Sequence, residues 1–456
     1  MKVGLCFVVG DNLGQHVLGE FNSNFSSGYI CRWCKITYKE ACKESLCYNG
    51  CQPDFVVMED HDRTAQLAEE GESDSDLYGI KGKCVFNELT AFHCVLQLPP
   101  CIGHDVLEGV LAKDIQFYLE YLFNKEKLMT VDDFNNKLKN FCLSSRDSKN
   151  RPKSFKPRKG DSKYEGNAGS LRVLSKIMTI ILDSVLGESS VGKHIIKLQK
   201  MVELIFAPRL SLYEIDYIME PTIREYLDLR ISAISELGMP NLKPKHHYLV
   251  HYGRLYKEVG PLIQVWGMRL ESKHVYFKKV IQAARNFKNP PMTCANRHQL
   301  AQVSYQYNGL FPKSLVIPDD SPTKEEYVAA SYGVSMVKIL EKVPHGAILP
   351  TMVTIWGTIY KPGMLLVLKK LDYGELKIGR LNSIAVIDKS RVIFECTTFI
   401  CNQSKHNYYV SLLKVNDCEF WPYNLLGDYH PLVRLGTEDS FVFSLHHFIS
   451  LLPDDS

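Results

Sequence analysis

The chain has 456 residues, of which 45% are hydrophobic and 23% are charged. This composition is typical of globular proteins and excludes a disordered chain. The formal net charge of +3 is too small to indicate a nucleic-acid partner by itself. No apolar run reaches the length of a membrane-spanning helix, and the first residues lack a complete signal-peptide core, so we expect an intracellular protein without a membrane anchor.

The first predicted segment, residues 1–60, opens on an apolar run from Val3 to Val9 that predicts a buried central strand. Asp11 follows at the carboxyl end of this strand, where open α/β sheets place ligands and catalytic groups. The alternative interpretation is that Asp11 caps a turn with Asn12 and Gly14.

A Cys-x-x-Cys pair, Cys31 and Cys34, can hold a tetrahedral zinc ion from one tight turn, but a structural site requires four ligands. The remaining two ligands come either from elsewhere in the chain or from nearby residues, which would form a local zinc knuckle. A further alternative is that the thiols are simply buried and reduced. The nearby candidates are Cys42, Cys47, Cys51 and His61.

Residues 61–98 read as an acidic linker, and the charge between positions 59 and 76 predicts a solvated loop. Helical periodicity then begins, and residues 99–242 predict an all-helical domain. We expect Asp105 to cap its first helix, with Glu108 completing a capping box; the alternative is that His104, Asp105 and Glu108 touch an active site. Further helices are expected over residues 171–186, 194–206 and 212–237.

A basic loop over residues 144–169 interrupts the helical domain. Such runs are usually solvated and mobile, but in a protein that handles DNA they neutralise phosphates without reading sequence. The candidate nucleic-acid-binding residues are Arg151, Lys153, Lys156, Arg158 and Lys159.

Residues 243–335 return to helical periodicity and contain a histidine pair. His247 and His251 are four residues apart, so on a helix both imidazoles face the same side and can share one metal ion, whereas His246 with His251 is a less regular alternative. Glu271 lies on a later helix, where it pairs with neighbours on the helix surface or serves a catalytic site.

Residues 336–456 predict a small β-rich domain, a barrel or a sandwich, because short β-branched runs alternate with turn residues. It carries no metal set and no nucleophile arrangement, so we assign it binding or architecture. The expected strands are residues 353–359, 364–369, 384–387, 392–398, 408–413 and 441–448.

The order of these motifs over residues 1–305 resembles the catalytic domain of DDE transposases of the CACTA, Mirage and Chapaev group, which is related to the V(D)J recombinase. The resemblance implies an α+β protein: a partial RNase H-like core with a large all-helical insertion, followed by the β-rich domain. The motifs that carry it are Gly-Asp-Asn at Gly10–Asn12, Cys-Arg-Trp-Cys at Cys31–Cys34, His-Asp-Val-Leu-Glu-Gly at His104–Gly109 and Arg-Leu-Glu-Ser-Lys-His at Arg269–His274.

The resemblance also implies roles for individual residues. Asp11 and Glu271 would be the second and third catalytic carboxylates, which hold Mg²⁺ or Mn²⁺ for DNA cleavage and strand transfer. The residues that would hold a structural Zn²⁺ are Cys31, Cys34, His247 and His251. Nothing before Val3 supplies the strand with the first aspartate, so we expect a chain truncated at its N-terminus and catalytically incomplete.

The resemblance implies DNA as the partner, a nuclear location and a role in DNA recombination derived from a transposable element. A homo-oligomer is compatible with it, and a small-molecule substrate is not expected. Two alternatives are a non-catalytic, zinc-stabilised protein that binds DNA or chromatin, and an interaction protein whose cysteines form a local zinc knuckle.

Overall fold

In the computed structural model the chain forms two compact units. The first unit consists of residues 1–267, 405–407 and 445–452, and the second unit of residues 268–404, 408–444 and 453–456. The structure describes residues 4–43, 57–72, 77–144, 147–158, 160, 162–311, 313–330, 337–371, 374–437 and 439–450.

The apolar run at the start of the chain does not form the predicted central strand. Its described residues, 4–10, have no regular secondary structure and no strand pairing, and the Val8 N–H donates to the Gln97 carbonyl at 3.0 Å. Leu5 and Val8 are half-buried against a hydrophobic core whose residues come from helices and loops. Among its described residues the first unit contains only isolated β-bridges, so no RNase H-like sheet is present there.

Helix α3 occupies the position of the predicted acidic loop, so that prediction was wrong. The acidic side chains cover one side of this helix, whereas His61, Thr64 and Ala65 are buried on the other. A spacing of three and four residues places these side chains on one helix face. The many acidic residues of the segment hid this short buried face in the sequence. The elements before residue 99 are α1 (Asn12–Leu18), α2 (Tyr38–Lys43), α3 (Met58–Glu70), the 3₁₀ turn η1 (Val85–Glu88) and α4 (Cys94–Gln97).

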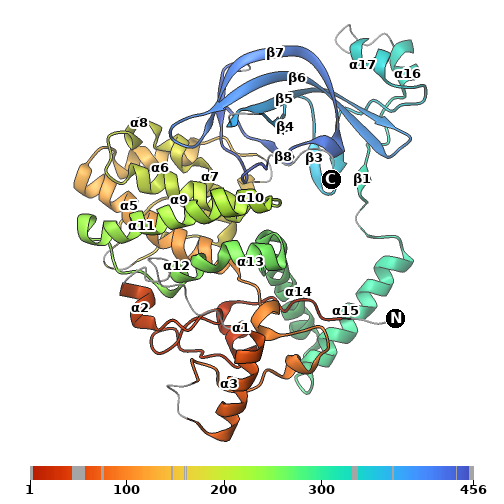
Figure 1. Cartoon of the computed structure of the whole chain (residues 1–456). Helices are drawn as coiled ribbons and strands as arrows, with labels where there is room; N and C mark the ends of the chain where they lie inside the picture. Colours follow the sequence, from red (N-terminus) through yellow and green to blue (C-terminus); the bar gives the residue numbers. More distant parts are fainter. Residues whose placement is uncertain are drawn as a thin grey trace. The chain divides into compact units, whose positions relative to one another are not determined.

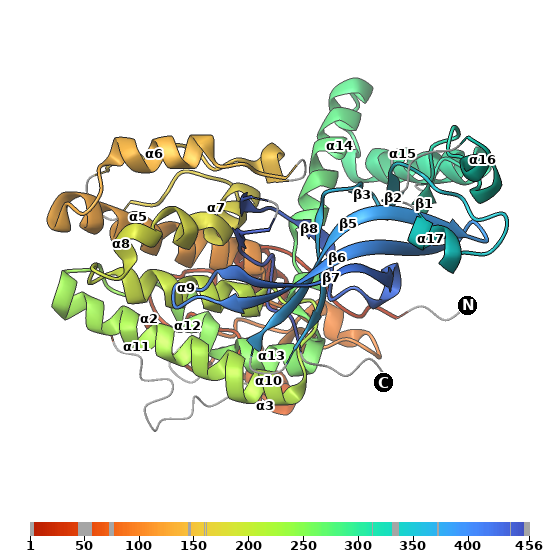
Figure 2. The same cartoon turned by 90° about the horizontal axis from the view of Figure 1, so that it is seen from above.

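The predicted helices of residues 99–242 are all present. In Figures 1 and 2, α9 and α11 run side by side, and α7 packs on the same helical layer. The elements are η2 (Gly103–Leu111), α5 (Ala112–Glu120), η3 (Tyr121–Glu126), α6 (Val131–Asn140), η4 (Asp147–Asn150), α7 (Ala168–Ile181), α8 (Asp183–Leu186), α9 (Gly192–Ile205), α10 (Leu212–Glu214), η5 (Ile215–Met219) and α11 (Glu220–Leu237).

The first of these helices begins differently from the expected capping box. Ile102 precedes η2, a wide-turn π-helix, and Asp105 is completely buried inside its first turn, so Asp105 is not the cap. Glu108 instead accepts a hydrogen bond from the Ala168 N–H at 2.9 Å. Its carboxylate therefore supports the start of α7, which Asn167 caps.

The basic loop is anchored by two aromatic side chains. Phe155 and Tyr164 are both buried, and the Phe155 ring lies 5.2 Å from the Phe123 ring and 6.3 Å from the Phe134 ring between centroids. The described part of this loop, which includes η4, is consequently packed against the helices through these rings, while its basic side chains are exposed.

The longest segment of the first unit, residues 1–267, ends with short helices that carry the histidine pair. They are α12 (Pro244–Tyr248), η6 (Leu249–His251), α13 (Tyr252–Val259) and η7 (Leu262–Gln264). None of the helices in the described ranges is both long enough and apolar enough to cross a membrane.

The second unit combines helices with a curled antiparallel sheet, so the described structure mixes helix and sheet and is compatible with the predicted α+β class (Figure 1). Seven strands follow the order β8-β4-β5-β6-β7-β10-β9, and a smaller sheet has the order β1-β2-β3. The helices are α14 (Met268–Ala284), α15 (Pro290–Tyr307), α16 (Lys324–Ala329) and α17 (Val337–Lys342). The strands are β1 (Leu315–Val316), β2 (Val353–Ile355), β3 (Thr358–Tyr360), β4 (Leu365–Lys370), β5 (Leu376–Ile387), β6 (Arg391–Gln403), β7 (Tyr409–Pro422), β8 (Asp428–Leu432), β9 (Leu435–Gly436) and β10 (Phe441–Phe443).

Side chains on the two faces of the large sheet enter two separate cores. Leu381, Ile384 and Phe394 belong to the core that β2 and β3 also line. Ala385 and Ile387 pack instead with residues of α17 and the segment after it. This change of face between neighbouring residues is the two-residue period expected of a sheet covered on both sides.

Candidate metal centre

The cysteine pair lies on a tight turn. Tyr29 and Thr37 form an antiparallel bridge, and the Ile30 N–H donates to the Ile36 carbonyl at 3.3 Å, which closes the loop around the Cys-x-x-Cys motif. Both cysteines are buried. The Trp33 N–H donates to the Cys31 sulfur at 3.4 Å. Backbone N–H groups aimed at a sulfur stabilise its thiolate form, which is the form that binds metal.

The histidine pair is presented by α12 and η6. Helix α12 begins at Pro244, and the four-residue spacing brings His247 Nε2 to 3.1 Å from His251 Nε2. Both rings are buried. The two nitrogens therefore face one point in the interior, as the helical spacing predicted.

The cysteine and histidine pairs meet across more than 200 residues of sequence. Cys31 Sγ lies 3.4 Å from His251 Nε2, and Cys34 Sγ lies 3.2 Å from His247 Nε2. All four donor atoms lie within 4.8 Å of one another. A tetrahedral zinc ion requires sulfur–nitrogen separations of about 3.5 Å and a nitrogen–nitrogen separation of about 3.3 Å. The observed distances match these values to within a few tenths of an ångström, so the group can hold a metal ion.

The protonation states suit a metal ion. Burial opposes ionisation of Cys31, but its hydrogen bond with Cys34 and the nearby rings of His251 and His247 hold its pKa well below the usual range. Burial lowers the pKa of His251, which favours its neutral ring. Thiolate sulfur and neutral imidazole are the forms that coordinate divalent metals.

A buried polar network supports the turn between the two cysteines. Arg32 lies 3.8 Å above the centroid of the Trp33 ring and donates from Nη2 to Gln15 Oε1 at 2.8 Å. It also donates from Nη1 to Asn12 Oδ1 at 3.0 Å, and Asn12 in turn donates to Asp105. This network joins three of the sequence motifs, and it accounts for the buried carboxylate of Asp105.

Asp105 also receives a hydrogen bond from the Tyr252 hydroxyl at 3.2 Å. Burial raises the pKa of Asp105, although Lys245 and Arg32 partly offset this effect. No local pattern in the sequence could indicate this environment, because the residues that contact Asp105 lie 93 and 147 positions away.

His246 belongs to a different network, which decides between the two histidine pairs. Its Nε2 lies 3.4 Å from the Asp114 carboxylate, and Arg230 Nε also donates to Asp114 at 3.1 Å. Burial opposes ionisation of Asp114, but Arg230 and His246 lower its pKa to about 2. His247, and not His246, therefore joins the cysteines.

The two candidate catalytic carboxylates, Asp11 and Glu271, belong to different units of the structure. Asp11 is exposed and caps α1, because its Oδ1 accepts a hydrogen bond from the Gly14 N–H at 2.7 Å. Glu271 lies on α14 in the second unit, and its side chain falls outside the described residues. The capping interpretation of Asp11 is the one that the geometry matches.

Two of the alternative ligands for a local knuckle, Cys42 and His61, do not belong to the group that contains Cys31 and Cys34. Cys42 is buried, and burial raises its pKa. Cys47 and Cys51 lie outside the described residues. His61 instead forms a separate group with Asp62 and His93. No sequence motif indicated this group, because Asp62 and His93 are 31 positions apart.

The described basic side chains of residues 144–169 are exposed, although some also hold the loop together. Arg151 Nη1 donates to the carbonyl oxygens of Leu138 and Phe141 at 3.1 Å each, which closes the end of α6. Lys153 and Arg158 share the carboxylate of Glu165. Lys159 lies outside the described residues.

Comparison with known proteins adds no assignment. No protein-family model matches the chain, and no curated protein matches it. The chemistry of the site therefore rests on the residues themselves.

Proposed function

We propose that the chain is a transposase-derived protein that binds DNA, is stabilised by zinc and does not cut DNA itself. The observation that carries the proposal is the buried group of two cysteines and two histidines, Cys31, Cys34, His247 and His251. These are the residues that the resemblance to DDE transposases assigns to the structural zinc. Two thiolates and two imidazoles in tetrahedral arrangement favour zinc over harder ions such as Mg²⁺.

The basic loop supports DNA as the partner. Among the described residues from 144 to 169, six exposed side chains are cationic, and the only exposed acidic one is Glu165. The exposed ion pairs of Glu165 are weak enough for phosphate to replace them. The cations are Lys149, Arg151, Lys153, Lys156, Arg158 and Lys163.

The position of Asp11 favours binding over cleavage. Asp11 Oδ1 accepts the Gly14 N–H and caps α1, a role that needs no metal ion. We therefore interpret the second catalytic position as a helix cap. The proposal places the protein in the nucleus, where its DNA partner lies.

Salt-dependent DNA binding tests the proposal. We expect a fluorescently labelled duplex to bind in an anisotropy titration, with an affinity that falls steeply as salt concentration rises. Replacing Lys153, Lys156 and Arg158 with glutamine should lower the slope of log affinity against log salt by about 2.7, which is about 0.9 for each phosphate that the variant no longer neutralises. The matched control replaces three exposed lysines outside the loop, Lys39, Lys125 and Lys193, and should keep the wild-type slope.

Equal slopes for the two triple variants would contradict the assignment of the loop. Nicking of plasmid DNA in Mg²⁺ or Mn²⁺ that Glu271→Gln abolishes would overturn the non-catalytic part and favour an active transposase. A zinc-bound protein without measurable affinity for DNA would instead support the interaction-protein alternative.

A further inference from the structure

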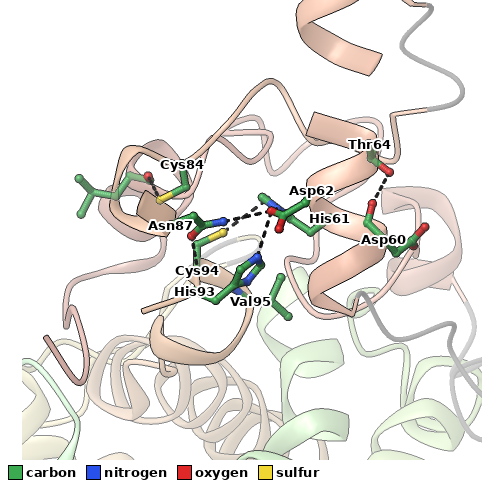
Figure 3. A network of polar contacts seen from close by, with 10 residues as sticks. Asp60, His61, Asp62, Thr64, Cys84, Asn87, His93, Cys94 and Val95 are labelled. Carbon is green, nitrogen blue, oxygen red and sulfur yellow. Dashed lines mark hydrogen bonds and ion pairs between the residues drawn. The ribbon is translucent and has the colours of Figure 1, made fainter. Parts of the chain in front are cut away.

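A second group of metal-ligand side chains lies in the first unit. His61 and Asp62 come from α3, and His93 immediately precedes α4; Figure 3 shows their side chains directed toward one another. Asp62 Oδ1 lies 3.3 Å from His61 Nδ1 and 3.1 Å from His93 Nε2. The donor atoms of the three residues lie within 4.8 Å of one another. This group shares no residue with the Cys-His centre.

The separations fit one shared divalent ion. Metal–nitrogen and metal–oxygen bonds of about 2.1 Å place adjacent ligands about 3.0 Å apart in octahedral geometry and about 3.4 Å apart in tetrahedral geometry. Both observed distances fall in this range. The His61 side chain is fully buried, whereas the Asp62 side chain is 59% exposed, so an ion on Asp62 can be reached from solvent.

Neighbouring groups fix the ligands from outside. Cys94 Sγ lies 3.3 Å from His61 Nε2, the ring nitrogen that faces away from Asp62, and the Phe21 ring packs on the His61 ring at 5.4 Å. Asn87 donates from Nδ2 to Asp62 Oδ1 at 3.4 Å. Outer contacts of this kind set the ring orientation of metal-binding histidines.

The same atoms can form hydrogen bonds without a metal, with Asp62 accepting an N–H from each ring. The two states differ at His93, whose Nδ1 accepts the Val95 N–H at 3.3 Å. A neutral imidazole has one proton, so an ion on Nε2 moves that proton to Nδ1 and removes the acceptor of Val95. Metal binding should therefore release the Val95 amide.

We propose that His61, Asp62 and His93 form a second site, which binds a divalent ion of the zinc class and leaves coordination positions open to solvent. Two imidazoles and one carboxylate with an open position are a common ligand set for exchangeable or catalytic ions. The site binds its ion more weakly than the buried Cys-His centre, because it has three protein ligands and loses the hydrogen bond of Val95. The proposal does not depend on DNA binding.

Calorimetric titration with Zn²⁺ tests the site in the 456-residue chain, which is first dialysed against a weak chelator so that only the Cys-His centre is filled. The wild type should bind one further equivalent. Asp62→Asn and His93→Gln should each weaken this second binding at least tenfold and keep the first zinc. Glu59→Gln removes an exposed carboxylate three residues before Asp62 on the same helix and should bind like the wild type.

The Val95 amide gives a readout in the wild type that does not depend on how the variants fold. In protein labelled with ¹⁵N-valine, the second equivalent should shift the Val95 amide signal and speed its exchange with solvent. A wild type that binds no second equivalent would overturn the site, as would second binding that survives in folded Asp62→Asn and His93→Gln. An unchanged Val95 signal at saturation would equally exclude His93 Nε2 as a ligand.

Discussion

Removing one histidine of the Cys-His centre should destabilise the whole first unit. A metal ion held by Cys34 and His247 joins residues 213 positions apart. In the chain-entropy model developed for disulfides, closing a loop of that length stabilises the folded state by about 5 kcal/mol at 25 °C. Because globular domains are stable by only about 5–15 kcal/mol, this contribution is a large share of the total.

We therefore expect His247→Gln to lose the tightly bound zinc and to lower the free energy of unfolding by about 5 kcal/mol. For a unit of this size the loss corresponds to a fall in melting temperature of about 10–20 °C. The assay combines zinc content after dialysis against a weak chelator with thermal unfolding followed by tryptophan fluorescence. Trp33 reports on the site, since its ring lies 5.5 Å from the His251 ring.

The neighbouring histidine provides the matched control. His246→Gln removes a buried imidazole that contacts Asp114 but not the cysteines, so it should keep the zinc and cost only about 1–2 kcal/mol. The reasoning is refuted if His247→Gln retains the tight zinc and unfolds at the wild-type temperature. It is equally refuted if His246→Gln is the variant that loses the metal.

Three further predictions concern residues of the first unit outside the metal centre. Burial raises the pKa of the Glu203 carboxyl in the folded protein to about 7, whereas its pKa in the unfolded chain is near 4.5. The folded state therefore binds this proton more tightly, and the resulting stabilisation is fully present below pH 4.5 and is lost as pH rises through about 7. Glu203→Gln should remove this pH dependence and make the protein more stable than wild type at pH 8 in urea titrations; an unchanged difference between pH 5 and pH 8 would contradict the assignment. Asp11→Ala removes the α1 cap and should lower the free energy of unfolding by about 0.5–2 kcal/mol. Asp11→Asn keeps a hydrogen-bond acceptor and should change the free energy of unfolding little. Equal losses in the two variants would argue against capping. Phe155→Ala should lower the free energy of unfolding by about 3–5 kcal/mol and expose the basic loop to proteases. Phe287→Ala, at a 71% exposed position, serves as the control. A loop that resists proteolysis in Phe155→Ala would show that this ring does not anchor it.

At the metal centre, local spacing predicted part of the site and not the whole of it. The two-residue gap between the cysteines and the four-residue gap between His247 and His251 are local geometry, so the sequence could indicate that each pair is able to share an ion. The pairing of the two motifs came from their resemblance to transposases. The choice of His247 over His246 required the fold, because Asp114 and Arg230 hold His246 from other helices.

Secondary structure was predictable where one period extended over many residues. The helices of residues 171–237 and the strands after residue 353 follow such periods. The strand predicted from Val3 to Val9 was wrong because a strand exists only through hydrogen bonds to a neighbouring strand. A sequence of seven residues cannot reveal whether such a neighbour is present. Helix α3 was predicted as a loop because only three of its positions are buried and acidic residues dominate its composition.

By itself, then, the sequence determined local features of this protein: the two residue pairs that can each share a metal ion, the basic loop, and the helical and β-rich regions. The tertiary structure alone decided which distant side chains meet. It assigned Asp11 to a helix cap, buried Asp105 in the Arg32 network and brought His61 and Asp62 to His93. The physical reason is that periodicity and spacing act over a few residues, whereas contacts between segments depend on how buried surfaces pack across the whole unit.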